Sequence, residues 1–162
     1  MDLVPNSRLR LDQKPFAIEN TREMFWRRLE GLGIRREQVE LVSSSPHWDG
    51  YRDIDICLDC WPHNAGTTTL ESLWMGVPVL TKIDRTSVGH LGAAMLRPLG
   101  LDDWVVKDER SYIQKAACFA SDTILLSALR TTLRQRLENS SLLDVKEYTL
   151  HLESAYKNMV KS

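Results

Sequence analysis

The sequence predicts an α/β fold, in which a parallel β-sheet is built from strands and crossover helices and is followed by a helical C-terminal end. The main observation is residues 55–81, where a short apolar run, a polar loop, an apolar-periodic segment and a second apolar run follow one another. This order has about the length that a right-handed crossover between parallel strands requires. The alternation continues along the chain and gives way to successive helices after residue 108.

The strands are predicted from short apolar runs bounded by turn residues. They cover residues 8–11, 39–42, 56–58, 77–80 and 104–106. No segment before the first strand could cover its neighbours in a sheet. We therefore expect the chain to begin inside a larger protein.

The first helices are placed by their terminal residues. Asn20 fits the N-cap of a capping box, and the helix that follows it is expected to end at Gly31 or Gly33. The next helix closes at Gly76, and Trp74 within it is expected in the core. Polar residues also open the later helices. The expected helix starts are Ser87 for residues 88–97, and then Asp108 or Glu109, Asp122 and Asp144.

Length and composition indicate one globular domain. The chain has 162 residues, of which 43% are hydrophobic and 27% charged, and a formal net charge of -1. A net charge so close to zero does not indicate nucleic acid or an anionic membrane as a partner. No apolar run approaches the roughly 20 residues that span a bilayer. The first residues also lack the pattern of a signal peptide, so we expect a cytoplasmic protein.

The three cysteines predict neither a disulfide framework nor a metal site. Cys57 and Cys60 form a C-x-x-C pair, and the count is odd. No second Cys/His pair has a spacing suited to zinc. We interpret the pair as reduced thiols, with a redox or zinc pair as the alternative.

Gly66, Thr67, Thr68 and Thr69 open the central helix where a parallel strand has just ended. The first turn of a helix carries unpaired N–H groups and the positive end of the helix dipole, and the threonines add hydroxyl donors. This pattern predicts a phosphate-binding site at the carboxyl edge of the sheet. Glu71 lies one helical turn further on and can accept hydrogen bonds from a ribose diol. The alternative is that the threonines only cap the helix.

Other polar residues follow neighbouring strands and are expected near the same crevice. His47 and Trp48 follow the strand at residues 39–42, and this histidine could stack on a nucleobase. Lys82 or Arg85 could reach a diphosphate, and His90 could approach a ligand. The alternative for each is an ordinary structural or surface position.

At this point a resemblance adds specificity. Residues 64–69 read Asn-Ala-Gly-Thr-Thr-Thr, and residues 71–79 read Glu-Ser-Leu-Trp-Met-Gly-Val-Pro-Val. These segments resemble the donor-binding lobe of the O-GlcNAc transferase/SPINDLY group, glycosyltransferase family 41. Residues 4–9, 55–59 and 146–156 are also similar to the group, so the resemblance spans nearly the whole chain.

The resemblance implies that residues 1–162 form a single Rossmann-like donor-nucleotide-binding lobe, with helices on both faces of its sheet and a C-terminal helix within 140–162. It would be the C-terminal lobe of a GT-B glycosyltransferase and a fragment of a larger enzyme, inactive alone. The enzyme would be inverting and metal-independent and would transfer GlcNAc from UDP-GlcNAc to Ser/Thr of proteins. It would need no cofactor beyond the nucleotide sugar, and acceptor proteins would bind through absent upstream regions.

The resemblance also implies residue roles. Diphosphate contacts would come from Gly66, Thr67, Thr68 and Thr69. Glu71 would bind the ribose, and His47 would lie against the base or the phosphates. Ser87, His90 and Lys82 are weaker candidates. No catalytic residue is assigned within this chain, because the basic residue that the family uses at the diphosphate lies upstream of Val4.

Three alternatives remain open at this stage. The Ala-Gly-Thr-Thr-Thr form is nearer to plant SPINDLY and bacterial members, some of which use GDP-fucose, so the lobe could serve a protein O-fucosyltransferase. It could also be a non-catalytic nucleotide-binding or scaffold module. A dinucleotide-dependent oxidoreductase ranks lowest, because no Gly-x-Gly-x-x-Gly run follows a first strand.

Overall fold

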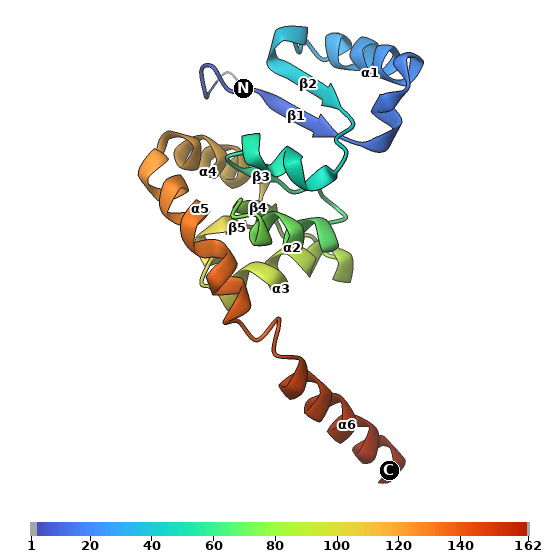
Figure 1. Ribbon diagram of the computed structural model, residues 1–162, viewed down its shortest axis with the longest axis vertical. Helices are drawn as coiled ribbons and strands as arrows, with labels where there is room; N and C mark the ends of the chain where they lie inside the picture. The colour runs from blue at the N-terminus through green and yellow to red at the C-terminus, as the bar shows by residue number, and fades with distance from the viewer. Residues whose placement is uncertain (1–2, 162) are drawn as a thin grey trace.

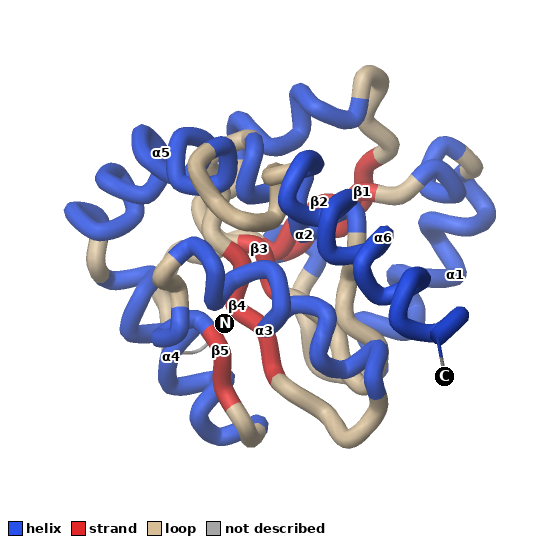
Figure 2. Tube along the Cα trace, turned by 90° about the horizontal axis from the view of Figure 1, so that it is seen from below, coloured by secondary structure: helices blue, strands red, loops and turns tan. Residues whose placement is uncertain are grey.

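The computed structural model describes residues 3–161, and within them the strands form two parallel ladders (Figure 1). In the first ladder, β1 (Leu9–Asp12) pairs with β2 (Val39–Val42), with Leu9 opposite Val39. In Figure 2 the strands run through the middle of the molecule with helices around them. The predicted α/β fold with parallel strands is therefore confirmed.

The second ladder has the order β3–β4–β5, with bounds Cys57–Leu58, Val79–Lys82 and Val105–Val106. Cys57 lies opposite Val79, and Thr81 lies opposite Val105. All four residues of β4 are buried, since strands flank it on both sides and helices pack on it. The strand predicted at 77–80 begins two residues later because the Val77 amide donates to the Ser72 carbonyl and closes the preceding helix.

The first crossover contains η1 (Lys14–Ala17), α1 (Glu19–Gly31) and η2 (Arg36–Gln38). The end of α1 at Gly31 agrees with the prediction. The prediction of Asn20 as its N-cap is wrong, because Ile18 occupies that position with extended backbone. The Ile18 carbonyl accepts from the Thr21 and Arg22 amides, so the helix starts directly from the η1 turn.

The segment between β2 and β3 contains η3 (His47–Asp53), and the crossover from β3 to β4 contains α2 (Thr67–Trp74). After β4 come η4 (Ser87–His90), α3 (Leu91–Leu96), η5 (Arg97–Leu99) and η6 (Asp102–Trp104). The prediction that Ser87 caps this region is wrong by one residue. Thr86 is the cap, since its hydroxyl oxygen accepts from the Gly89 amide at 3.2 Å.

Two helices, α4 (Glu109–Ser121) and α5 (Thr123–Glu138), follow β5 and complete the body. Their predicted caps are confirmed. Asp108 accepts a hydrogen bond from the Ser111 amide at 2.8 Å, and Asp122 accepts from the Leu125 amide at 2.9 Å. These bonds satisfy donors that the first turn of each helix leaves unpaired.

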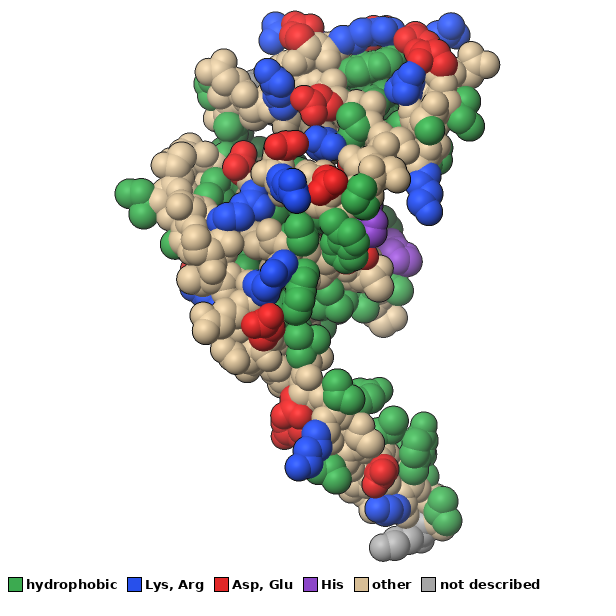
Figure 3. All heavy atoms as spheres, in the orientation of Figure 1, with side chains coloured by type: hydrophobic (Ala, Val, Ile, Leu, Met, Phe, Trp, Pro, Cys, Tyr) green, Lys and Arg blue, Asp and Glu red, His purple; other side chains and the backbone are tan. Residues whose placement is uncertain are grey.

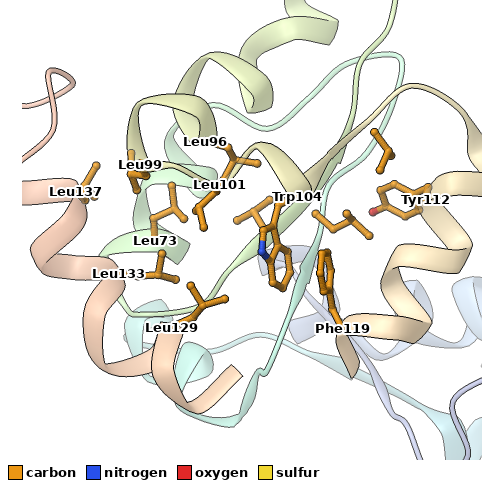
Figure 4. Close-up of a cluster of buried hydrophobic side chains, with 13 residues drawn as sticks. Leu73, Leu96, Leu99, Leu101, Trp104, Tyr112, Phe119, Leu129, Leu133 and Leu137 are labelled. Atoms are coloured by element: carbon orange, nitrogen blue, oxygen red, sulfur yellow. The ribbon is translucent and has the colours of Figure 1, made fainter. Parts of the chain in front are cut away.

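The hydrophobic core lies between the second ladder and its helices, and α2 and α5 meet there (Figure 4). Trp104 is 3% exposed and stacks on Phe119 with ring centroids 4.0 Å apart. The prediction that Trp74 is a core residue is wrong, because its side chain is 38% exposed. The guanidinium of Arg134 lies over the Trp74 ring, 4.8 Å from its centroid, and its Nε donates to the Trp74 carbonyl.

The last helix, α6 (Val145–Lys161), extends away from the body (Figure 1). Asp144 begins it as predicted, accepting from the Glu147 amide at 2.9 Å. Hydrophobic side chains are exposed along it (Figure 3), and they include Val145, Tyr148, Leu150, Leu152, Tyr156, Met159 and Val160. Among residues 3–161, no helix has the length and apolarity needed to cross a membrane.

Removing residues 144–162 is expected to change the free energy of unfolding of the remaining chain by less than about 0.5 kcal/mol, because the described side chains of α6 from 145 to 160 are all exposed. Urea unfolding of the full and shortened chains would measure this difference. A loss above about 1 kcal/mol would show that α6 packs on the body in solution.

Candidate functional site

A buried carboxylate holds the loop between β3 and α2. Asp59 is 5% exposed, and its Oδ1 accepts from the amides of Cys60 at 2.9 Å and Ala65 at 2.8 Å. Its Oδ2 accepts from the Thr81 hydroxyl of β4 at 2.6 Å. A side chain at Gly92 of α3 would collide with Thr81 and with Asp59 Oδ2, so α3 packs tightly against this pair. The loop is therefore held at both ends to the carboxyl edge of the sheet.

A second buried side chain supports the same loop. Asn64 is fully buried, and its Nδ2 donates to the carbonyls of Cys60 at 2.8 Å and Lys82 at 3.3 Å. Its backbone amide donates to the Val88 carbonyl. Asn64 thus ties the loop to the segment that follows β4, and the first turn of α2 begins from a rigid support.

The first turn of α2 presents donors to solvent, as predicted for Gly66, Thr67 and Thr68. Both threonine side chains are exposed, and a Cβ added at Gly66 would meet nothing within 4 Å. Among the described residues, no carbonyl accepts from the amides of Gly66, Thr67 or Thr68. An anion can therefore approach three amides and two hydroxyls at the positive end of the helix dipole.

Thr69 differs from its neighbours. Its side chain is 1% exposed, its hydroxyl donates to the Ala65 carbonyl at 3.0 Å, and its amide donates to the Gly66 carbonyl. Both of its donors are therefore engaged within the turn. The Thr69 hydroxyl bond is a back-bond to the carbonyl four residues earlier, and no side chain caps this helix. With both donors engaged, Thr69 is less open to a ligand than its neighbours, and its diphosphate contact stays a prediction.

Glu71 and His47 lie together, as expected for residues on the same edge of the sheet. The Nε2 of His47 is 3.7 Å from Oε1 of Glu71, and these groups form an ion pair when the imidazole is protonated. The His47 ring also lies against the Trp48 ring, with centroids 4.3 Å apart. Glu71 is 30% exposed at its side chain, so it remains open to a ligand beside Thr67 and Thr68.

Two of the weaker candidates, Lys82 and His90, line a hollow. Its other lining residues are Ile83, Asp84, Arg85 and Lys107. Lys82 is 8% exposed, and its Nζ lies 3.4 Å from Asp84 Oδ2 and over the Trp61 ring. A hydrogen bond from the Arg85 amide lowers the pKa of the Asp84 carboxyl, which keeps this partner charged. Lys82 is thus already paired.

His90 and Ser87 are both exposed in this region. The Nδ1 of His90 lies 2.9 Å from the Thr86 carbonyl, which leaves its Nε2 free to contact a ligand. In the described part of the chain, neither side chain makes a hydrogen bond or an ion pair to the first turn of α2. They stay predictions.

The C-x-x-C pair, Cys57 and Cys60, is not joined by a disulfide in the structure. Cys57, Cys60 and Cys118 are free thiols. Burial raises the pKa of the Cys57 thiol, which disfavours the reactive thiolate.

Two residues of the site were not identified from the sequence. The Tyr51 hydroxyl lies 3.5 Å from Oε2 of Glu71, and Arg130 of α5 donates to the Tyr51 and Met75 carbonyls. Tyr51 lies four residues after His47 within the 3-10 helix η3, and this closeness in sequence is the one signal that could have indicated it. Arg130 carries no local signal, because its partners are distant in sequence.

Comparisons with a family model, with curated proteins and with solved structures all identify similar glycosyltransferases. A family model described as Glycosyl transferase family 41 matches residues 1–152. Arabidopsis thaliana "Probable UDP-N-acetylglucosamine--peptide N-acetylglucosaminyltransferase SPINDLY" is 38% identical over 162 residues, which are 98% of this chain and 18% of that protein. The protein of the same name from Solanum lycopersicum is 36% identical over 163 residues, with the same coverage. The chain therefore spans 18% of the length of these relatives.

Among solved structures, a mutant of Thermobaculum terrenum O-GlcNAc transferase matches with a TM-score of 0.86 and 36% identity. The match covers 96% of this chain and 30% of that one. This likeness confirms the predicted fold class over nearly the whole chain.

Proposed function

We propose, because the chain belongs to glycosyl transferase family 41, that it forms the lobe that binds the nucleotide sugar donor of a protein O-glycosyltransferase. One observation carries this proposal: the first turn of α2 offers unpaired donors to solvent while Asp59 and Asn64 hold its loop in place. The diphosphate would bind at Gly66, Thr67 and Thr68.

The proposed reaction is an inverting, metal-independent transfer of GlcNAc from UDP-GlcNAc to Ser/Thr hydroxyls of proteins. The leaving nucleoside diphosphate gains negative charge in the transition state. Amides and hydroxyls that are already oriented toward that charge stabilise it without reorganisation. The chain would supply this stabilisation, and other regions would bring the acceptor protein.

The ribose would bind beside the phosphates at Glu71. A carboxylate is poorly placed against a phosphate but accepts hydrogen bonds from a diol. The base would lie near His47, whose ring is half exposed next to Trp48. The base itself distinguishes the UDP-linked donor from the GDP-linked alternative.

The variants Thr67→Ala and Glu71→Ala are each expected to weaken nucleoside diphosphate binding by about 1.5–3 kcal/mol. Each removes a hydrogen bond with one charged partner, which is the phosphate for Thr67 and the carboxylate itself for Glu71. Calorimetric titration with UDP and GDP side by side would measure this and show which base is preferred. Both variants should keep the stability of the parent chain, because Thr67 is exposed and Glu71 is partly exposed.

Thr131→Ala on α5 is the matched control, because this threonine is exposed and its hydroxyl bonds only to its own helix. Unchanged affinity in both site variants would contradict the proposed site. Binding of NADH without either nucleoside diphosphate would instead favour the oxidoreductase alternative.

A further inference from the structure

Tyr51 and His47 engage opposite oxygens of the same carboxylate. The Tyr51 hydroxyl lies 3.5 Å from Oε2 of Glu71, whereas Nε2 of His47 lies 3.7 Å from Oε1. Both residues belong to η3, which therefore supplies two contacts to Glu71. They differ in burial, because Tyr51 is 8% exposed while the His47 side chain is 54% exposed. Tyr51 is therefore the fixed partner and His47 the displaceable one.

The backbone of Tyr51 is held from behind by α5. Nη1 of Arg130 donates to the Tyr51 carbonyl at 3.1 Å and to the Met75 carbonyl at 3.3 Å, and Nη2 donates to the Ile54 carbonyl. Met75 directly follows α2, the helix that carries Glu71. One guanidinium thus sets the distance between η3 and α2, and with it the distance between the Tyr51 hydroxyl and Glu71.

The chemistry of the pair suits a diol. Burial and the neighbouring Glu71 carboxylate contribute to raising the pKa of the Tyr51 phenol, so the hydroxyl keeps its proton and remains a donor. A carboxylate offers lone pairs on both oxygens. If the tyrosine holds Oε2, then Oε1 is directed outward, where His47 now lies and where a diol could replace it.

We propose that Tyr51 is a positioning residue of the ribose subsite, which fixes one oxygen of Glu71 so that the other accepts from the diol of the nucleotide. This inference rests on the proposed function, which assigns Glu71 to the ribose. A glutamate side chain has several rotatable bonds, and ordering it only when the ligand binds would reduce affinity. Tyr51 orders it before binding.

The test compares a ribonucleotide with an analogue that lacks the diol. Kd values of UDP and 2′,3′-dideoxy-UDP, or of the guanosine pair if GDP binds more tightly, would be measured by calorimetry. In Tyr51→Phe, binding of the ribonucleotide should weaken about 3–10-fold while binding of the dideoxy analogue stays unchanged. Glu71→Ala should remove the preference for the diol altogether.

Tyr112→Phe is the matched control for removing a buried phenolic hydroxyl. Tyr112 is 7% exposed, and its hydroxyl donates to the Asp59 carbonyl rather than to Glu71. Any effect of this variant should be equal for the two nucleotides. Phenylalanine keeps the packing of either ring, and the thermal unfolding midpoint of each variant would verify that it folds.

The possible results distinguish a failure of the Tyr51 positioning role from a failure of the proposed nucleotide site. Equal weakening of both nucleotides in Tyr51→Phe, or no weakening of either, would overturn the positioning role while leaving the site intact. If Glu71→Ala keeps the diol preference, or if the parent chain binds no nucleoside diphosphate, the ribose assignment and this inference fail together.

Discussion

Replacing Trp104 with alanine is expected to lower the free energy of unfolding by about 3–5 kcal/mol, because it removes a large side chain from a closely packed core. Trp104 is 3% exposed and stacks on Phe119 with an angle of 14° between the rings. The buried cluster around it draws its side chains from the second ladder and from α2, α3, α4 and α5, so they cannot fill the cavity without moving whole elements. Denaturant unfolding followed by tryptophan fluorescence and circular dichroism would measure the loss.

Trp74→Ala is the matched control, since it makes the same change at a surface position. The Trp74 ring is 38% exposed and lies under the Arg134 guanidinium. Its removal should cost about 1 kcal/mol, the usual size for a partly exposed contact. An effect of Trp74→Ala equal to or larger than that of Trp104→Ala would contradict the assignment of the core.

The error at Trp74 shows where hydrophobic periodicity in the sequence does not determine which residue is buried. The helix α2 spans only eight residues, so its short pattern allows an apolar stripe through Leu73 or through Trp74. Packing against α5 selects Leu73, which is fully buried. The longer α5 leaves no such choice, since Leu129, Leu133 and Leu137 recur at helical spacing and all three are buried.

Helix caps were predictable where an aspartate opens the helix. Asp108, Asp122 and Asp144 each bond to an amide three residues on, which is a local interaction. The predictions failed at Asn20 and Ser87. At Ser87 the neighbouring Thr86 is an equally good cap, and at Asn20 the start of the helix is set by the preceding 3-10 turn.

The sequence predicted those features of the candidate site that depend on neighbouring residues, but not the contacts between residues that are distant in sequence. The unpaired first turn at Gly66 and the position of Glu71 one turn later follow from helix geometry. The Tyr51–Glu71 contact joins residues 20 positions apart, and the Arg130–Tyr51 contact joins residues 79 apart. Such pairings depend on how η3 and α5 pack, which no local pattern encodes.

Asp59→Ala is expected to cost about 3–4 kcal/mol of unfolding free energy and to weaken nucleotide binding as well. The substitution leaves the Cys60 and Ala65 amides and the Thr81 hydroxyl without their acceptor, and Thr81 is fully buried. A buried donor left unpaired costs about 1–3 kcal/mol, and the three losses are not independent. The loop would then relax, and the Gly66 and Thr67 amides would lose their common orientation.

Asp59→Asn separates the contribution of charge from that of geometry. The amide oxygen can still accept from Ala65 and Cys60, and the amide nitrogen can donate to the Thr81 hydroxyl. We therefore expect a loss of about 1–2 kcal/mol, with most of the nucleotide affinity retained. Urea unfolding and calorimetry on the same preparations would measure both quantities. If Asp59→Ala binds nucleotide as tightly as the parent chain, the first turn of α2 does not need this carboxylate. The support of the predicted diphosphate site must then come from Asn64 and the other side chains that bond to the loop, such as Tyr112.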